Sequence, residues 1–325
     1  MNSSVTCHKV QDYKNAVKIR AGLEAVVNPL GGISAFVKPG NTVLLKPNFV
    51  KVLDPAQGGV THPVVIAEMA KYCLEAGAKK ILIGDSPGFG TAKSVAEKMG
   101  LMELIHGLPV EVIEFTEVQK RTGDLRNGCF EALHQSGEVI AADVLINLAK
   151  AKAHCQMVLT GATKNLFGCI PGRRKALMHC QVKNNKLTFG RMLVENAETL
   201  APSLSIVDGV IAMQGMGPTS GTPYQWGWLF ASTDFIALDR VLAKSLGYKQ
   251  REIPHLIASK ELHVGAESLG SIHLIGAKPK ELLASGFEKA HLLPVTFNPI
   301  RLGIGYFKHK YQWYKREFRL GVLKG

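Results

Sequence analysis

Short apolar runs alternate along the chain with longer segments whose apolar residues recur at helical spacing. The apolar runs predict strands at residues 42–46, 78–85, 109–115, 144–150, 204–210, 228–232 and 272–277, with two more short strands between 123 and 143. The helical spacing predicts helices at residues 64–76, 91–99, 190–199, 234–247, 251–260 and 279–286. Thr61 is expected to cap the first helix, with Pro63 in its first turn, and Gly77 to end it.

The alternation of strands and helices is typical of a mostly parallel sheet, so we expect an α/β fold. The length of 325 residues fits two domains of ordinary size. We expect two Rossmann-like lobes with mostly parallel sheets and a cleft between them. Residues 1–140 would form the first lobe, residues 141–300 the second, and residues 301–325 a basic, aromatic tail.

Composition narrows the class of protein. With 46% hydrophobic and 20% charged residues, the chain is neither disordered nor a coiled coil. The 39 Lys and Arg outnumber the 26 Asp and Glu, which permits nucleic acid, anionic lipid or phosphorylated small molecules as partners without choosing among them. Six cysteines are too few for a disulfide scaffold. Because neither a secretory leader nor a long apolar span is apparent, we expect a cytoplasmic protein.

Residues 143–180 carry the densest group of polar side chains. The segment holds Lys152, Lys164, Arg173 and several further cations, and Asp143 is its one acidic residue. Gly161 and Gly172 lie among them, and glycine lets a ligand approach the backbone. Unbalanced positive charge beside glycines indicates a site for an anionic ligand or cofactor, whereas a solvated basic loop is the alternative.

Histidine and cysteine side chains in the same segment offer nitrogen and sulfur ligands for a metal ion. These residues are His154, Cys155, Cys169, His179 and Cys180. No CxxC pair is present, so a structural zinc or a ferredoxin-type cluster has weak support. Burial of unligated cysteines is the competing interpretation.

Two other parts of the chain could contribute to a site. The turn after the strand at 78–85 contains Asp85 and Ser86 at a carboxyl end, where open α/β sheets bind ligands, although no dinucleotide or ATP fingerprint is present. Asp208 and Asp239 are interpreted as caps or turn acids. The tail at 301–325 has seven Lys or Arg against one Glu, interleaved with aromatics. Such a segment suits an anionic membrane surface or single-stranded nucleic acid, or a helix docked on the body.

Seven ordered motifs between residues 40 and 245 resemble the family of domain of unknown function 362. They are KPNFV (46–50), GGVTHP (58–63), EAGAKKILIGDSPG (75–88), DVLINLAKAKAH (143–154), TGATKNLFGCIPG (160–172), IVDGVIAMQGMGP (206–218) and ASTDFIALD (231–239). Members of that family often carry an added ferredoxin-like module, which this chain lacks.

The run from His154 through Gly161 and Lys164 to Gly172 also resembles the signature of nickel-pincer lactate racemases. That resemblance implies that Lys164 is joined covalently to a nickel-binding pyridinium mononucleotide, that His154 acts as acid and base, and that His179 binds the metal. The racemase family has a second histidine where this chain has Gly84-Asp85-Ser86-Pro87. True racemisation needs a base on each face of the substrate carbon, so a one-sided reaction fits better.

Three functions remain open. The first is a metal- or cofactor-dependent oxidoreductase or isomerase that acts on a small anionic, 2-hydroxy-acid-like substrate by proton and hydride transfer. The second is an iron–sulfur-associated redox protein working with a ferredoxin, and the third a module that binds lipid or nucleic acid through its tail, with nucleic acid not favoured. For the first, Lys164 and His154 are the catalytic candidates, and His179, Cys155, Cys169 and Cys180 the metal candidates. Cofactor binding is assigned to Lys46, Asn48, Thr61, His62, Asp85, Ser86, Lys152, Gly161, Asn165, Gly172 and Arg173.

Overall fold

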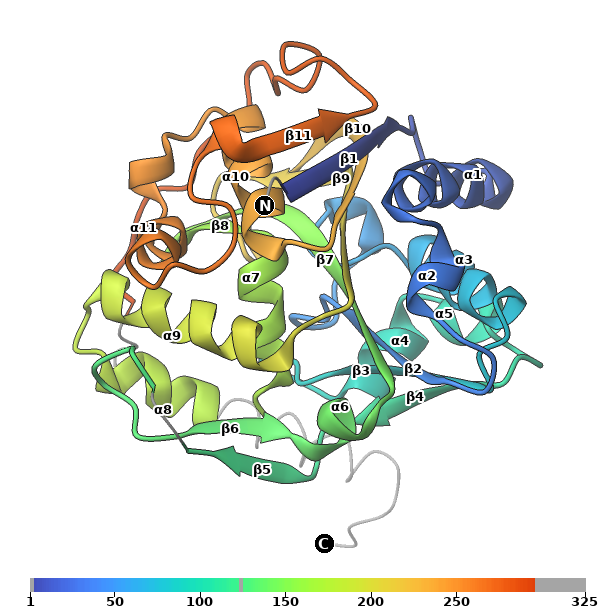
Figure 1. Cartoon of the computed structure of the whole chain (residues 1–325), viewed down its shortest axis with the longest axis horizontal. Coiled ribbons are helices and arrows are strands. Elements are labelled where there is room, and N and C mark those ends of the chain that lie inside the picture. Colours follow the sequence, from blue (N-terminus) through green and yellow to red (C-terminus); the bar gives the residue numbers. More distant parts are fainter. Residues whose placement is uncertain (1–2, 123–124, 296–325) are drawn as a thin grey trace, which may run out of the picture.

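The computed structural model describes residues 3–122 and 125–295 and has an α/β architecture (Figure 1). Its main sheet has nine strands: β1 (Ser3–Lys9), β2 (Thr42–Pro47), β3 (Lys80–Asp85), β4 (Val110–Glu114), β7 (Val144–His154), β8 (Val158–Thr160), β9 (Leu204–Gln214), β10 (Thr222–Ser232) and β11 (Ile272–Ile275). A separate hairpin pairs β5 (Val118–Arg121) with β6 (Leu133–Ser136). The tail at 301–325 lies outside the described residues.

The main sheet runs in the order β11-β1-β10-β9-β7-β2-β3-β4, with β8 paired to β7. The strands from β4 through β9 in this order are mutually parallel, while β10 is antiparallel to both β9 and β1. The expected α/β class with mostly parallel pairing is therefore confirmed.

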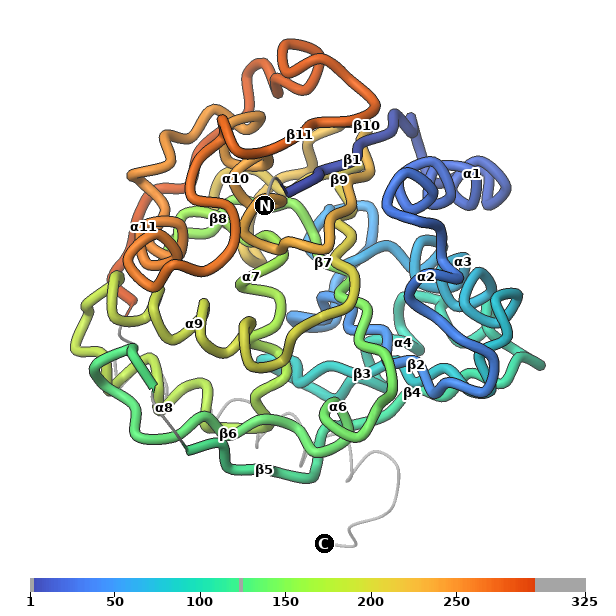
Figure 2. Tube along the Cα trace, viewed as in Figure 1, coloured from blue at the N-terminus to red at the C-terminus, as the bar shows by residue number. Residues whose placement is uncertain are grey.

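The two expected lobes share this one sheet. Strand β2 from the first expected lobe pairs in parallel with β7 from the second, so the sheet continues across residue 140. The expected boundary falls in the short helix α6 (Gly137–Ala141), directly before β7. At the other side, β1 lies between β10 and β11, far from the strands that follow it in the sequence (Figure 2).

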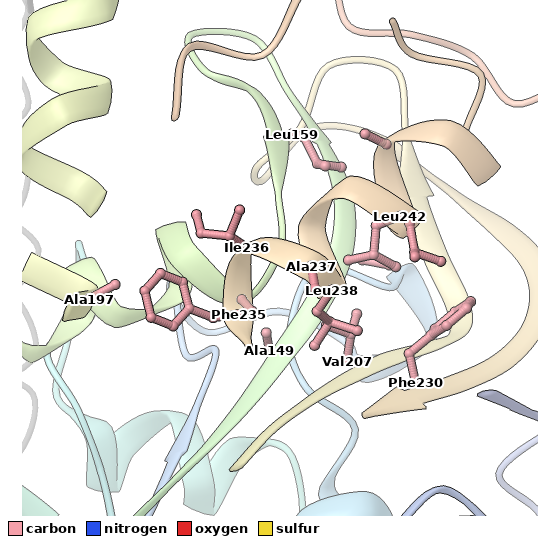
Figure 3. Close-up of a cluster of buried hydrophobic side chains, with 14 of the residues drawn as sticks. Ala149, Leu159, Ala197, Val207, Phe230, Phe235, Ile236, Ala237, Leu238 and Leu242 are labelled. Atoms are coloured by element: carbon pink, nitrogen blue, oxygen red, sulfur yellow. The ribbon is translucent and has the colours of Figure 1, made fainter. Parts of the chain in front are cut away.

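Helices cover both faces of the sheet. One face packs against α1 (Ala16–Val27), α2 (Ile33–Phe36), α3 (Pro63–Glu75), α4 (Ala92–Lys98) and α5 (Leu101–Leu104). The other faces α7 (Ala162–Asn165), α9 (Lys186–Leu200), α10 (Phe235–Ser245) and α11 (Pro254–Glu261), with α8 (Arg174–Gln181) beside them. Alternation along β7 supplies both cores, because Leu148 faces the first group of helices and Ala149 the second. Figure 3 shows the second core, where Phe235 and Leu238 of α10 pack toward Ala149 and Val207.

Most expected elements are present, with three corrections. Of the two short strands expected between residues 123 and 143, only β6 lies in that range, because β5 precedes it and residues 137–141 form α6. His62, and not Thr61, caps α3: its Nδ1 accepts from the N–H of Val64 at 3.3 Å, because the Thr61 hydroxyl is committed to the Leu148 carbonyl at 2.7 Å. The helix expected at 279–286 is wrong, since that segment forms turns and Leu282 is its one buried apolar side chain. A single apolar anchor does not offset the cost of nucleating a helix.

Strand β7 is longer than expected. It runs four residues beyond the apolar stretch that ends at Lys150, and all of its residues are buried. The extension carries Lys152 and His154 into the interior as part of the sheet. In the described part of the chain, no helix has the length and apolar character needed to cross a membrane.

Candidate active site

Charged side chains gather on four neighbouring parallel strands, close to the carboxyl ends of β2 and β3. Lys46 lies near the end of β2, Asp85 ends β3, Lys150 and Lys152 lie in the second half of β7, and Asp208 lies in the middle of β9. Parallel strands place their carboxyl ends at one edge of the sheet, which is where open α/β sheets bind ligands. The topology therefore assembles residues from both expected lobes into one region.

Lys46 and Asp85 form a buried ion pair. The Lys46 Nζ lies 2.9 Å from Asp85 Oδ1, and the two side chains are 0% and 6% exposed. Asp85 also accepts backbone hydrogen bonds from Phe49 and Ser86, both at 2.7 Å. Gly168 packs directly against the pair: a Cβ there would lie 2.2 Å from Asp85 Oδ1. Because the Lys46 and Asp85 side chains bond to each other and to backbone groups, their positions are fixed on one side of the site.

A second buried pair joins Lys150 and Asp208. Their Nζ and Oδ2 atoms are 2.7 Å apart, and the hydroxyl of Tyr13 donates to Asp208 Oδ1 at 2.6 Å. The His62 ring stacks on the Tyr13 ring with 3.6 Å between centroids and 3° between planes. Asp208 further accepts from the His62 N–H at 3.0 Å. Burial lowers the pKa of His62 to about 4, so this imidazole is neutral at pH 7.

Lys152 is buried without a carboxylate. Its Nζ donates to Asn48 Oδ1 and to the Gly59 carbonyl, both at 2.8 Å, and lies 3.5 Å from the Pro218 carbonyl. Burial, and then the nearby positive charges of Lys164 and Lys150, hold the pKa of Lys152 well below its ordinary value. Buried lysines are normally paired with acids, so this arrangement favours an additional anionic partner.

Lys164 lies in the four-residue helix α7, whose start is held by Asp239. Asp239 accepts from the N–H groups of Ala162 at 2.6 Å and Thr163 at 3.0 Å. Gly161 is needed here, because a Cβ on it would lie 2.0 Å from the Asp239 carboxylate. The expectation that Asp239 serves as a cap is thus confirmed, with the cap made to a helix distant in sequence.

The amine of Lys164 lies in partly buried surroundings. The residue is partly exposed, and its Nζ lies 6.0 Å from the centroid of the Phe167 ring. No hydrogen bond or ion pair of this amine is formed with the described residues. Burial lowers the pKa of Lys164 to about 8, with Cys155 nearby acting weakly in the opposite direction. About a tenth of such an amine is uncharged, and therefore nucleophilic, at pH 7.

Two histidines near Lys164 have opposite tautomers. The Nδ1 of His154 accepts from the N–H groups of Gln156 at 3.0 Å and Met157 at 3.3 Å, so its neutral form carries the proton on Nε2. The Nδ1 of His179 lies 3.0 Å from the Val295 carbonyl, which can only accept, so its neutral form carries the proton on Nδ1. Burial and the charge of Lys164 lower the pKa of both, to about 3 for His179.

The expected sulfur ligands are separated. Cys155 lies near Lys164, whereas Cys169 is fully buried near Lys46 and Asp85, and burial raises its pKa to about 12. Cys180 is partly exposed in α8. Within residues 3–122 and 125–295, no three His, Cys, Asp or Glu side chains are grouped as a metal site. The four-residue metal set therefore stays a prediction, and its members lie in different surroundings.

The turn after β3 is tied to the start of α8. The Ser86 hydroxyl accepts from the Gly172 N–H at 3.1 Å and from the Lys175 amine, which also donates to the Ile170 carbonyl at 2.8 Å. Arg173 is exposed beside this contact. Burial lowers the pKa of Lys175 to about 8. Ser86, Gly172 and Arg173 are thus neighbours, as their assignment to one site requires.

The structure brings most sequence-predicted residues into one region and adds four more. Lys46, Asn48, Thr61, Asp85, Lys152, Gly161 and Asn165 are linked through the contacts above or through hydrogen bonds to one another. Sequence reasoning missed the roles of Tyr13, Lys150, Lys175 and Asp208. Asp208 accepts from the Val210 N–H at 3.2 Å, as a turn acid does, but it is also fully buried and ion-paired with Lys150, a role that the sequence analysis did not assign. The signal available for the Lys150–Asp208 pair was that each of two predicted strands, 144–150 and 204–210, carries one charged residue of opposite sign among its apolar residues.

Comparison with known proteins identifies the family. The profile described as "Domain of unknown function (DUF362)" matches residues 43–244. The "Thylakoid-associated protein sll1697" of Synechocystis is 38% identical over 318 residues, covering 98% of this chain and 97% of that protein.

Two solved structures resemble the chain more distantly. The lactate racemase apoprotein from Thermoanaerobacterium thermosaccharolyticum is 15% identical with a TM-score of 0.44, covering 71% of this chain and 54% of that one. A Thermotoga maritima protein is 13% identical with a TM-score of 0.43, covering 78% and 61%. The chain thus spans less than two thirds of either structure. On the family match and the 38% identical relative, this chain belongs to the DUF362 family, a domain of unknown function.

Proposed function

We propose that this protein is an acid–base enzyme that acts on a small anionic substrate at the Lys164 cluster, defined as Lys152, His154, Lys164 and His179. The observation that carries the proposal is the amine of Lys164. It has a pKa near 8, no ion pair with a described residue, and two neutral imidazoles within electrostatic reach. Catalytic sites typically hold ionisable groups in surroundings that shift the pKa of these groups and that the stability of the fold does not require.

A carboxylate substrate would suit the charges of the cluster. Lys152 and Lys164 have no carboxylate partner among the described contacts, so an anion bound beside them would be stabilised by both amines. Bringing in that negative charge would raise the pKa of each lysine and keep it protonated. A 2-hydroxy acid offers such a carboxylate next to a carbon that bears a hydroxyl group.

His154 is proposed to move the substrate proton. In its observed tautomer the Nε2 carries hydrogen, so it can donate a hydrogen bond to the substrate oxygen. To accept the hydroxyl proton in the oxidising direction, Nε2 must be unprotonated, with the ring hydrogen on Nδ1. The ring then becomes an imidazolium, which returns the proton in the reducing direction. This form requires Nδ1 to give up the hydrogen bonds from Gln156 and Met157.

The residues also fit the nickel-containing nucleotide that the resemblance implies. His179 has its Nδ1 hydrogen on a carbonyl, which leaves Nε2 unprotonated as a metal ligand requires. Lys164 offers an amine that is partly uncharged near neutral pH, as covalent attachment requires. When bound, the group would supply hydride acceptance. In this chain Lys164 would hold it and would then carry no charge, so that Lys152 alone would bind the substrate carboxylate. His179 would ligate its metal, and His154 would handle the proton.

The reaction we favour is one-sided, as in an oxidoreductase or a non-racemising isomerase. Asp85 lies where the racemase family has a second histidine, and its carboxylate is engaged by Lys46 and two backbone N–H groups. It is therefore poorly disposed to serve as a second mobile base.

The test compares wild-type protein with Lys164→Met and Lys93→Met, all purified anaerobically. Lys93 is an exposed lysine of α4 and serves as the matched control. We expect wild type and Lys93→Met to bind lactate or a related 2-hydroxy acid in calorimetry, and Lys164→Met to lose binding at least ten-fold. Intact mass and nickel content measured on the same samples establish whether Lys164 carries an added group. Equal binding by all three proteins would remove the proposal.

A second proposal concerns residues 301–325, which we propose make peripheral contact with anionic membranes. It is supported by the seven Lys or Arg among aromatics in that segment and by the relative described as thylakoid-associated. We expect the full chain to co-sediment with vesicles containing anionic lipid and not with neutral vesicles, and a chain ending at residue 300 to stay in solution. Sedimentation of the shortened chain would contradict it, and salt-sensitive binding to single-stranded RNA alone would favour nucleic acid instead.

A further inference from the structure

Three buried asparagines form a continuous hydrogen-bond chain beneath the Lys164 cluster. They are Asn48 after β2, Asn165 at the end of α7 and Asn147 in β7, with 9%, 3% and 0% of their surface exposed. The Nδ2 of Asn48 donates to Asn165 Oδ1 at 2.8 Å, and the Nδ2 of Asn165 donates to Asn147 Oδ1 at 2.8 Å. These three residues are called the asparagine chain below.

The direction of the asparagine chain follows from the groups at its ends. Lys152, which donates to Asn48 Oδ1, can only donate when protonated. At the other end, Asn147 Nδ2 donates to the Ala162 carbonyl at 3.0 Å, and a carbonyl can only accept. Because a donor stands at one end and an acceptor at the other, each amide has one orientation that leaves no clash. Reversing any one of them would oppose two acceptors or two donors.

The asparagine chain holds α7 at both of its ends. Asn165 is the last residue of α7 and also donates to the Lys46 carbonyl at 3.0 Å, while Asn147 binds the carbonyl of Ala162, the first residue. A helix this short has little stability of its own, since isolated helices need several turns to form. Its position is therefore set by contacts from outside, which determine where the amine of Lys164 lies.

We propose that Asn165 is a positioning residue, which acts through the asparagine chain to hold Lys164 at a fixed place relative to Lys152. This inference rests on the proposed function. It gives Asn48 and Asn165, which the sequence analysis predicted to bind the cofactor, a role in orienting the catalytic amine instead. The amides of Asn48 and Asn165 are already occupied by each other, by Lys152 and by the main chain. They act on a ligand through the lysines.

The experiment measures the reactivity of the Lys164 amine, which needs no substrate. Wild type and variants are acylated with trace acetic anhydride from pH 6 to 10, and the rate at each lysine is read by peptide mass spectrometry, with Lys93 as internal standard. The midpoint of rate against pH reports the amine's pKa, whereas accessibility changes only the height of the curve. Asn165→Ala and Asn147→Ala interrupt the asparagine chain. Asn127→Ala is the control, because Asn127 is fully buried and its recorded side-chain hydrogen bonds join Glu195, Cys129 and Phe130, none of which belongs to α7.

We expect the midpoint for Lys164 to rise in both chain variants, because a loosened α7 admits water to the amine. A rise from about 8 to about 9 lowers the uncharged fraction at pH 7.5 about eight-fold. Asn127→Ala should lose thermal stability and leave the Lys164 midpoint at the wild-type value. If Asn165→Ala does not fold, Asn48→Ala cuts the asparagine chain at its opposite end and is measured instead.

An unchanged Lys164 midpoint in the chain variants would overturn the inference, and so would an equal change in Asn127→Ala. Failure of the proposed function looks different. In that case Lys164→Met would keep substrate binding, while the chain variants would still shift the Lys164 midpoint.

Discussion

Lys46 and Asp85 meet across the ends of adjacent strands at 2.9 Å, and Gly168 closes the space above them without a side chain. The pair comes from β2 and β3, whereas Gly168 follows α7. The backbone that carries Lys164 therefore continues directly onto this ion pair. This backbone can approach the Lys46–Asp85 pair so closely because Gly168 has only a hydrogen atom where every other residue has a Cβ.

Gly168→Ala should destabilise the protein by about 2–4 kcal/mol. The added Cβ would lie 2.2 Å from Asp85 Oδ1 and 2.7 Å from Lys46 Nζ, so the pair or the backbone must move. Urea denaturation measures the loss. Gly88→Ala is the control, since the nearest atom to its Cβ would be 3.4 Å away, and it should change stability by less than about 1 kcal/mol. Equal losses in the two variants would contradict the role given to Gly168.

Asp208→Asn should destabilise the protein by about 3–5 kcal/mol, because it leaves the fully buried Lys150 ammonium without a counter-ion. Asp143→Asn is the control: this exposed carboxylate accepts only from the Thr42 N–H among its recorded bonds and should cost under about 1 kcal/mol. In the double variant Asp208→Asn with Lys150→Met, part of the loss should return. Additive losses in that double variant would show that the two residues do not stabilise each other.

Lys164→Met should leave the free energy of unfolding at pH 7 unchanged or raise it by about 1 kcal/mol, since burial disfavours the charged amine. The lowered pKa also fixes the pH dependence. The folded state binds the Lys164 proton less well than the unfolded state. The resulting loss of folding stability is therefore fully present below about pH 8 and disappears above about pH 10.5. The stability advantage of the variant should shrink over that range. A marked loss of stability at pH 7 would show that Lys164 is a structural residue.

Glu138 should contribute stability that acid removes. Burial alone would raise its pKa, but hydrogen bonds from Ser136 and from the N–H groups of Glu117 and Thr116 lower it to about 2. A carboxyl with a lowered pKa stabilises the fold above about pH 4.5, and this stabilisation is lost as pH falls toward 2. Glu138→Gln should cost about 1 kcal/mol at pH 7 and nothing near pH 2, by urea denaturation at several pH values. A cost independent of pH would contradict this.

The apolar runs were sufficient to predict most of the buried strands, because a short run of Leu, Ile and Val has few alternatives to a buried parallel strand. They did not predict β1 or β8, and they did not place β5. They also placed the 143–180 segment at a strand end, where its unbalanced positive charge made Lys152 a candidate for binding an anion. The catalytic roles of His154 and Lys164 came from the resemblance to nickel-pincer lactate racemases. The apolar runs did not reveal that β7 continues through Lys152 to His154, because charged residues normally end a buried strand. Here the strand continues because Lys152 finds three neutral acceptors inside the fold.

Pairings between distant residues were beyond sequence reasoning. The contact of Tyr13 with Asp208 joins positions 195 residues apart, and no local pattern indicates it. Asn48 and Asn165 were both predicted to bind the cofactor, and their side chains bond to each other, which only the fold could show. The helix expected at 279–286 failed for a related reason, since helical spacing predicts a helix only where a surface is present to bury its apolar face.

The place of β1 in the sheet has a consequence for how the chain is made. Thr6 pairs with Ala231, so β1 must wait for a strand that is synthesised more than 200 residues later. Until β10 is complete, β1 has unpaired backbone groups and β9 has an open edge. Folding of this protein should therefore finish late and depend on its C-terminal third. A chain stalled before residue 222 would expose the edge of β9, where it is most prone to associate with other chains or to be bound by chaperones.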